Sequence, residues 1–260
     1  MIRSLWTAST GLNAQQTSLD VIANNLANVS TNGFKRQRAI FEDLLYQVIR
    51  QPGAQSTQQT QISSGLQLGV GVKTVATARN FTQGAPQQTG GDLDLMIQGD
   101  GFFMITMPDG TTAYTRDGAF QRDNQGNMVT ASGYPLADNI NIPADAVSIT
   151  VGKDGTVTVV QAGSSASIQI GTIQLAMFIN PGGLQAVSEN LFLETASSGV
   201  ATPQQAGSNA AGVINQRYVE SSNVNVADEL VNMIITQRAY EMNSRVISTS
   251  DQMLARLAQL

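Results

Sequence analysis

Three closely spaced carboxylates are the first candidates for chemistry in this sequence. Asp92 and Asp94 alternate along a predicted strand, and Asp100 follows in the segment "GDGFF". Two carboxylates facing each other across a cleft are the groups that glycoside hydrolysis requires. A structural interpretation also fits, because Asp before Gly forms turns and Asp at the start of a strand discourages edge pairing. We favour the structural interpretation and predict no catalytic residue.

The composition excludes much other chemistry. The 260 residues include no Cys and no His, which removes thiol nucleophiles, disulfides and the usual zinc and iron ligands. The segment "DLDLMIQGDG" also lacks the acidic spacing of a calcium loop. We therefore predict neither a metal site nor a cofactor site.

Charge argues against nucleic acid or an anionic membrane as the main partner, and the lack of a long apolar run argues against insertion into a membrane. The formal net charge is −5, whereas nucleic acids and anionic membranes attract clustered positive charge. Lys35, Arg36 and Arg38 form one small basic group, which can either contact phosphate or complement the end of a helix and point into solvent. We favour the second interpretation. No apolar run has transmembrane length, and "LWTASTGLNAQQTS" lacks the apolar core of a signal peptide, so we expect any export to proceed without a cleaved signal.

The N-terminal segment is predicted to be one amphipathic helix that ends at Asn32-Gly33. Its leucines recur every seven residues, and a second row follows three positions later, with one polar break at Gln15. Gly33 is suited to the left-handed conformation that ends a helix. The apolar residues of this helix that we assign to a self-assembly seam are Leu5, Leu12, Leu19, Ile22, Leu26 and Val29.

The C-terminal segment is predicted to be a second long helix, with Asn225 as its N-cap and Asp228 and Glu229 in its first turn. A second apolar stripe on an adjoining face indicates burial on more than one side. The seam residues of this helix are Val226, Met233, Tyr240, Ile247 and Leu254. The second stripe comprises Val231, Ile235, Met242, Val246, Met253 and Leu260.

Short alternating runs with β-branched and aromatic residues fill the middle of the chain, and Asp-Gly or Gln-Gly pairs separate several of them. A Gln-, Ser- and Gly-rich stretch from Tyr46 to Gly71 precedes them and indicates an extended arm. The predicted fold class is therefore α+β, with terminal helices that pair as a coiled coil. The predicted domains are residues 1–33 with 222–260 as a helical core, 34–82 as a connecting arm, and 83–221 as a β-rich domain.

Three blocks of sequence together form a family signature. The first is "ANNLANVSTNGFKRQR", and its matching positions are Asn24, Asn25, Asn28, Thr31, Gly33, Phe34 and Lys35. The second spans Asp92 to Leu136 and the third spans Ser222 to Ser244. In this order the three blocks resemble the flagellar rod and hook family of axial proteins. Within that family the length and the arm, with Gln51, Pro52, Gly53 and Gly65, are most similar to the distal rod subunits.

The resemblance implies a structural, non-enzymatic subunit of a self-assembling helical tube. It implies that the terminal helices line the inner wall, that the arm forms a middle layer, and that the β-rich domain faces outward. It further implies export through the flagellar type III apparatus, a place in the periplasm, and contacts with copies of itself, proximal rod and hook proteins, surrounding rings and a rod cap. The alternatives are a proximal rod or hook subunit, or a secreted β-rich peptidoglycan hydrolase or adhesin.

Overall fold

The computed structural model describes residues 2–51, 55–57, 60–61, 63–163, 166–209 and 211–257. The chain divides into two compact units. The helix–arm unit contains the described residues of Met1–Leu26, Gln37–Ala78 and Asn225–Leu260. The β unit contains those of Ala27–Arg36 and Arg79–Val224. Each unit is therefore assembled from segments that are distant in the sequence.

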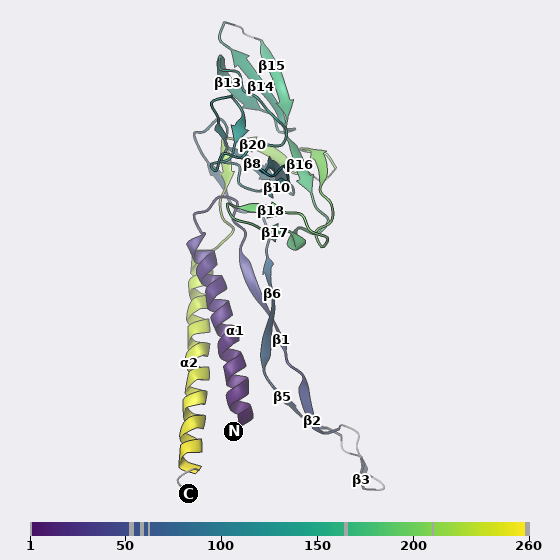
Figure 1. Ribbon diagram of the computed structural model, residues 1–260, viewed down its shortest axis with the longest axis vertical. Coiled ribbons are helices and arrows are strands. Elements are labelled where there is room, and N and C mark those ends of the chain that lie inside the picture. Colours follow the sequence, from purple (N-terminus) through teal and green to yellow (C-terminus); the bar gives the residue numbers. More distant parts are fainter. Residues whose placement is uncertain are drawn as a thin grey trace. The chain divides into compact units, whose positions relative to one another are not determined.

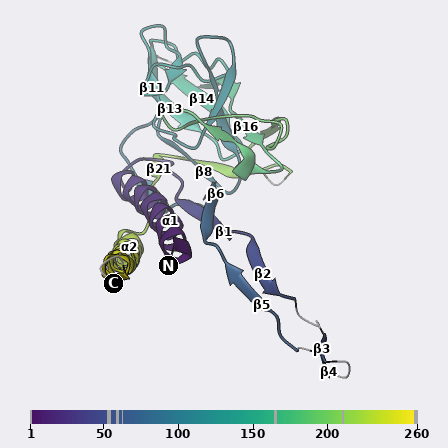
Figure 2. The ribbon, with the colours of Figure 1, turned by 60° about the horizontal axis from the view of Figure 1, so that its bottom comes forward.

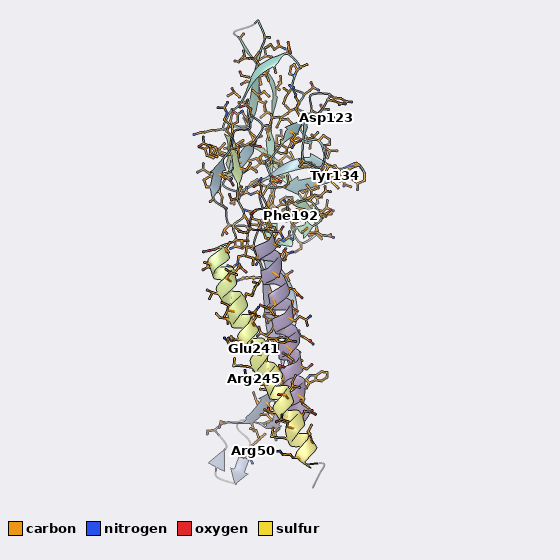
Figure 3. The ribbon with its side chains drawn as sticks, turned by 90° about the vertical axis from the view of Figure 1, so that its left-hand side faces the viewer. Arg50, Asp123, Tyr134, Phe192, Glu241 and Arg245 are labelled. Carbon is orange, nitrogen blue, oxygen red and sulfur yellow. The ribbon has the colours of Figure 1, made fainter. Side chains whose placement is uncertain are left out.

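Two helices form the core of the helix–arm unit. Helix α1 spans Ile2–Ala27 and α2 spans Val226–Leu257, and they lie side by side in opposite directions (Figure 1; Figure 2). The predicted N-cap of α2 is confirmed, because Asn225 Oδ1 accepts a hydrogen bond from Ala227 N at 3.1 Å. The predicted terminal helices are thus both present. On the outer side of α2, Glu241 pairs with Arg238 at 3.6 Å, although the sequence also places Arg245 one turn after it (Figure 3).

The end of α1 differs from the expectation. The helix stops at Ala27, and residues 28–33 form turns instead of a final helical turn. Thr31 explains the difference, because its backbone N donates to Asn28 O at 3.2 Å and its hydroxyl donates to Asn28 Oδ1 at 3.1 Å. Such local bonds compete with helix formation. The expected left-handed glycine is confirmed, since Gly33 has φ +68°.

The arm is a succession of two-stranded ribbons (Figure 1). It begins with β1 (Gln37–Asp43) beside β6 (Val72–Arg79), continues with β2 (Tyr46–Arg50) beside β5 (Leu66–Gly69), and reaches β3 (Gln55–Thr57) beside β4 (Thr60–Gln61). The arm packs closely against α1 near Gly71 and Val72. A Cβ added to Gly71 would lie 2.2 Å from Thr10 Oγ1, and the backbone N of Val72 donates to that same oxygen at 3.4 Å.

The β unit is organised around a six-stranded sheet and a three-stranded sheet. The larger sheet has the order β17 (Gln185–Ala186), β18 (Leu191–Leu193), β10 (Thr112–Thr115), β9 (Phe102–Thr106), β16 (Gln174–Met177) and β19 (Thr202–Gln205). The smaller sheet has the order β13 (Ala146–Val151), β14 (Thr156–Gln161) and β15 (Ser167–Thr172). Three strand pairs complete the unit: β11 (Gln121–Arg122) with β12 (Met128–Val129), β8 (Leu95–Gln98) with β20 (Val213–Gln216), and β7 (Pro86–Gln88) with β21 (Tyr218–Glu220). A short 3-10 helix, η1, spans Pro181–Gly183.

Strand β9 separates two hydrophobic clusters. Phe103 and Ile105 belong to the larger cluster, whereas Phe102 and Met104 belong to the smaller one. Because successive side chains of a strand point to opposite faces, the unbroken apolar run is buried on both sides. Phe192 packs in the smaller cluster, with its ring 5.9 Å from that of Phe102 (Figure 3).

The predicted hairpin turns are confirmed at several positions. Gly110 lies between β9 and β10, and Gly155 lies between β13 and β14, with φ of +82° and +83°. At the first turn, Asp109 Oδ1 accepts bonds from both the backbone N and the hydroxyl of Thr111. This is the turn chemistry expected of Asp-Gly.

Neither described helix has the length and hydropathy needed to cross a membrane.

Candidate assembly interface

The three aspartates considered for catalysis make structural contacts, Asp92 through its carboxylate and the other two through their backbone carbonyls. Asp92 Oδ1 lies 2.7 Å from Arg217 Nη2 in an exposed ion pair. The carbonyl of Asp94 accepts the backbone N–H of Arg217, and the carbonyl of Asp100 accepts that of Gly212, each at 2.7 Å. Among the residues that the structure describes, no three Asp or Glu side chains gather in a way that could hold a metal ion. The interpretation as turn and strand residues therefore accounts for their positions.

The motif turn, residues 28–36, is fixed inside the β unit by Glu220 on β21. The backbone N of Gly33 donates to Glu220 O at 2.8 Å. Lys35 Nζ lies 2.6 Å from Glu220 Oε1 and donates to Thr82 O at 2.9 Å. Both side chains of the Lys35–Glu220 pair are only 1% exposed. The motif turn thus contributes a buried charge to the interior of the β unit.

A second cation shares the same carboxylate. Arg116 Nε lies 3.3 Å from Glu220 Oε2, and the guanidinium also donates to the carbonyls of Gly101 and Gly99 at 2.8 and 2.7 Å. Burial lowers the pKa of Lys35, while the adjacent Glu220 carboxylate opposes that shift by favouring the ammonium form. The interpretation of the basic group as solvated cations is therefore wrong for Lys35, since it has no access to solvent or to phosphate. Arg38 is exposed.

Asn25 joins three elements of the helix–arm unit. Its Nδ2 donates to Gln37 O at 2.8 Å and to Glu229 Oε2 at 3.3 Å, and its Oδ1 accepts the Gln37 backbone N–H at 2.9 Å. Asn25 and Glu229 are each 1% exposed. α1, α2 and the first residue of β1 therefore meet at one buried polar centre. Two other residues of the family motif differ in exposure. Asn24 lies on the exposed side of α1, and Phe34 is partly buried. The backbone carbonyl of Phe34 accepts the backbone N–H of Asn223.

A second contact between the helices lies further along both of them. A Cβ added to Gly11 would lie 3.0 Å from Asn243 Nδ2, so glycine permits the close approach at this point. Gly11 precedes Asn25 by two heptads, and Asn243 follows Glu229 by the same interval. Both contacts therefore belong to a single antiparallel register.

The most deeply buried side chains of α2 are polar. Glu229, Thr236 and Ser250 are buried and Asn243 is partly buried, and these four residues recur every seven positions. The sequence-based prediction did not include this polar row. Its seven-residue period equals that of the apolar rows and indicates a helix face equally well. It passed unnoticed because covered helix faces are usually apolar.

The residues assigned to the self-assembly seam have mixed exposure, and their role in assembly stays a prediction. Ile22 is buried, and Val226 and Tyr240 are exposed. The remaining seam residues are partly exposed: Leu5, Leu12, Leu19, Leu26, Val29, Met233, Ile247 and Leu254. A partly exposed leucine row leaves apolar surface on α1 for a further contact.

The second stripe of α2 is the most exposed apolar surface on that helix. Ile235 is 61% exposed and Met242 is 62% exposed. We call this surface the α2 stripe, and its described members are Val231, Ile235, Met242, Val246 and Met253. Leu260 lies outside the described residues. Contiguous exposed apolar surface of this kind marks an interaction site.

The arm also carries exposed apolar side chains on both strands of its ribbons. Examples are Ile49 on β2 and Leu66 on β5, and Leu45, between β1 and β2, is exposed as well. Of the residues that mark the rod-type arm, Gln51 is exposed and Gly65 is partly exposed, while Pro52 and Gly53 lie outside the described residues. A two-stranded ribbon with little cover is marginal alone in water. The arm therefore offers a second surface on which a neighbouring molecule can pack.

Known protein families match the chain at both ends and in the β unit. The matching families are "Flagella basal body rod protein" at residues 5–35, "Flagellar hook protein FlgE/F/G D1 domain" at residues 96–159, and "Flagellar basal body rod FlgEFG protein C-terminal" at residues 215–260. The first match includes Asn25 and residues 28–35 of the motif turn, and the third includes Glu220 and α2.

Relatives match the chain over its full length. The chain is 54% identical to the flagellar basal-body rod protein FlgG of Buchnera aphidicola subsp. Acyrthosiphon pisum over 100% of both chains. It is 49% identical to that of Caulobacter vibrioides over 100% of this chain and 99% of the relative. It is 39% identical to that of Bacillus subtilis over 100% of this chain and 99% of the relative. The chain therefore belongs to the FlgG family of flagellar basal-body rod proteins.

Proposed function

We propose that this rod subunit polymerises into the distal rod by burying the α2 stripe against neighbouring copies. The observation that carries the proposal is the exposure of Val231, Ile235, Met242, Val246 and Met253 along one side of α2. Burying a side chain such as Ile is worth about 1.5–3 kcal/mol. Membership of a rod family, together with an open apolar stripe on a long helix, favours a second copy of the chain as the occupant.

The proposed arrangement assigns a layer to each part of the chain. Residues 1–33 and 222–260 pair as a coiled coil and line the inner wall of a tube, 34–82 form a middle layer, and 83–221 form the outer layer. The exposed apolar residues of the arm support a packed middle layer, because they need a partner in water. In this arrangement the rigid tube transmits torque and encloses the export channel.

The proposed partners follow from the family. They are further copies of the chain, proximal rod and hook proteins, and the surrounding rings and rod cap, in the periplasm after export without a cleaved signal. The chain is proposed to act without catalysis, and the ion pair between the Asp92 carboxylate and Arg217 supports this for Asp92. No metal or cofactor is part of the proposal.

Replacing Ile235 with aspartate tests the proposed interface. Ile235 is exposed in the chain, so the variant should keep the helical content and unfolding transition of the unmodified protein. In a polymer every copy would bury the new carboxylate, at a desolvation penalty of several kcal/mol. We expect no filaments by electron microscopy of concentrated protein, and no motility when the variant replaces the rod gene.

Gln237→Asp is the matched control for this test. Gln237 is also exposed on α2, and it lies two residues further on, which places it on the opposite side of the helix. It adds the same charge and should leave filaments intact. Normal filaments from Ile235→Asp would exclude the α2 stripe as the interface, and loss of filaments in both variants would assign the effect to charge alone.

A further inference from the structure

The β unit contains two long stretches of sequence without a charged side chain. They are residues 155–188 and 195–216, in a chain of which 13% of the residues are charged. The two stretches supply β16 and β19, which pair at one edge of the six-stranded sheet. Exposed edge strands usually carry charges that discourage contact with another molecule. β19 has one proline, Pro203, and no charge, so this edge has little protection of that kind.

The two most exposed large apolar side chains among the described residues of the β unit lie at the end of this strand pair. Ile179 is 97% exposed and Val200 is 77% exposed. The ladder ends with Met177 level with Thr202. The same register, continued for two residues, places Ile179 level with Val200, and residues level with each other in an antiparallel pair have neighbouring side chains. We call these two residues the aliphatic pair.

Hydrogen bonds hold the two segments that carry the aliphatic pair. The backbone N of Asn180 donates to Ser198 O at 3.4 Å, and Asn180 Nδ2 donates to Ser197 O at 3.1 Å. At the end of η1, the carbonyl of Gly183 accepts the hydroxyl of Thr195 at 2.7 Å. Side chains on a backbone that is already ordered lose less conformational entropy when a partner covers them. The aliphatic pair is therefore suited to serve as an anchor.

A cavity of about 190 Å³ lies beside Ile179, which forms part of its wall. Three aromatic rings also line it, those of Phe81, Phe102 and Phe178. An apolar cavity of about 150 Å³ is enough to hold benzene, so this one has room for an apolar side chain of a neighbour. Asp100 and Arg116 contribute polar groups to the lining, and Arg116 is already paired with Glu220.

We propose that the aliphatic pair and the adjoining cavity form a contact between the β units of neighbouring copies of this chain. A different protein is usually selected through complementary charge, which residues 155–188 and 195–216 do not offer. Identical copies each carry a formal charge of −5, so they meet with least repulsion through uncharged surface. The inference rests on the proposed function, because it presumes self-assembly, and it adds a contact that is separate from the α2 stripe.

Photocrosslinking in swimming cells identifies the occupant directly. Ile179 is replaced with the photocrosslinker p-benzoylphenylalanine, and irradiation should join two copies of the chain, seen as a dimer on a denaturing gel. The same replacement at Val147 is the matched control, because Val147 is 71% exposed on β13 and lies outside both uncharged stretches. It should give little or no dimer. If the variant at position 179 does not swim, the replacement is made at Val200 instead.

The crosslinks leave no neutral result. Absence of a crosslink, a crosslink only to another protein, or as much dimer from position 147 as from position 179 overturns the proposal. The dimer is expected whether or not the α2 stripe is the main interface, so this readout does not depend on the Ile235→Asp result.

Ile179→Asp tests the energetic importance of the same contact. Ile179 is almost fully exposed, so the unfolding transition should stay unchanged, whereas burial of the new carboxylate between copies should abolish filaments and motility. Val147→Asp adds the same charge and should leave both intact. Normal filaments from Ile179→Asp, or loss of filaments in both variants, overturns the proposal. Filaments that survive Ile235→Asp but not Ile179→Asp would contradict the α2 stripe and support this contact.

Discussion

Replacing Glu220 with alanine is expected to lower the free energy of unfolding of the β unit by about 3–5 kcal/mol, the cost typical of breaking a buried ion pair. Glu220 Oε1 lies 2.6 Å from Lys35 Nζ and accepts the backbone N–H of Gly84 at 2.8 Å. Its other oxygen lies 3.3 Å from Arg116 Nε. The variant would leave the buried cations Lys35 and Arg116 without the carboxylate that pairs with both of them.

Asp92→Ala is the control for the Glu220 variant. Asp92 also pairs with an arginine, Arg217, but the two side chains are 47% and 61% exposed. Exposed pairs contribute about 0–1 kcal/mol, so this variant should unfold at nearly the same urea concentration as the unmodified chain. Urea unfolding followed by circular dichroism makes the comparison. Equal, small losses in the two variants would show that the buried cluster does not stabilise the β unit.

Replacing Gly33 with alanine is expected to cost about 2–5 kcal/mol, because left-handed strain adds to a steric clash. Gly33 has φ +68°, and a Cβ there would lie 2.7 Å from the backbone N of Asp117 and 2.8 Å from the carbonyl carbon of Arg116. These are backbone atoms, which cannot rotate away as a side-chain end can. The motif turn would have to move, and Lys35 would move with it.

Gly133→Ala separates the cost of left-handed backbone strain from the cost of the steric clash. Gly133 also has a positive φ, +87°, but a Cβ added there has nothing within 4 Å. Its cost should be about 1–2 kcal/mol, from backbone strain alone. Thermal unfolding of the two variants gives the difference. If Gly33→Ala costs no more than Gly133→Ala, the close packing of the motif turn against Arg116 and Asp117 is not important for stability.

Local features of the fold were predictable because their causes are local. The cap at Asn225 depends on one side chain and the next two residues, and the turn at Asp109-Gly110 depends on three. The apolar run of β9 predicts a strand with no reference to its partners. The left-handed glycine at residue 33 was predictable for the same reason, even though the helix before it ends earlier than expected.

The buried charges of the candidate site could not be predicted, because their causes are distant in the sequence. Lys35 follows a helix and precedes two further basic positions, which favours a solvated side chain. Its burial depends on Glu220, which is 185 residues away, and on Arg116. Only the folded chain brings these three together. Likewise, the apolar rows dominate the pattern of α2, while the row covered within the chain contains Glu229, Thr236 and Asn243.

The separation of Lys35 from Glu220 also has a consequence for the order of events in a cell. Chains are synthesised from the N-terminus at about 5–20 residues per second, so Lys35 exists for roughly 10–40 s before its partner is made. Contacts between such remote residues raise the contact order and slow folding. The motif turn cannot form its buried ion pair in the β unit before Glu220 has been synthesised. A newborn subunit thus remains incompletely folded until nearly its whole length has been synthesised.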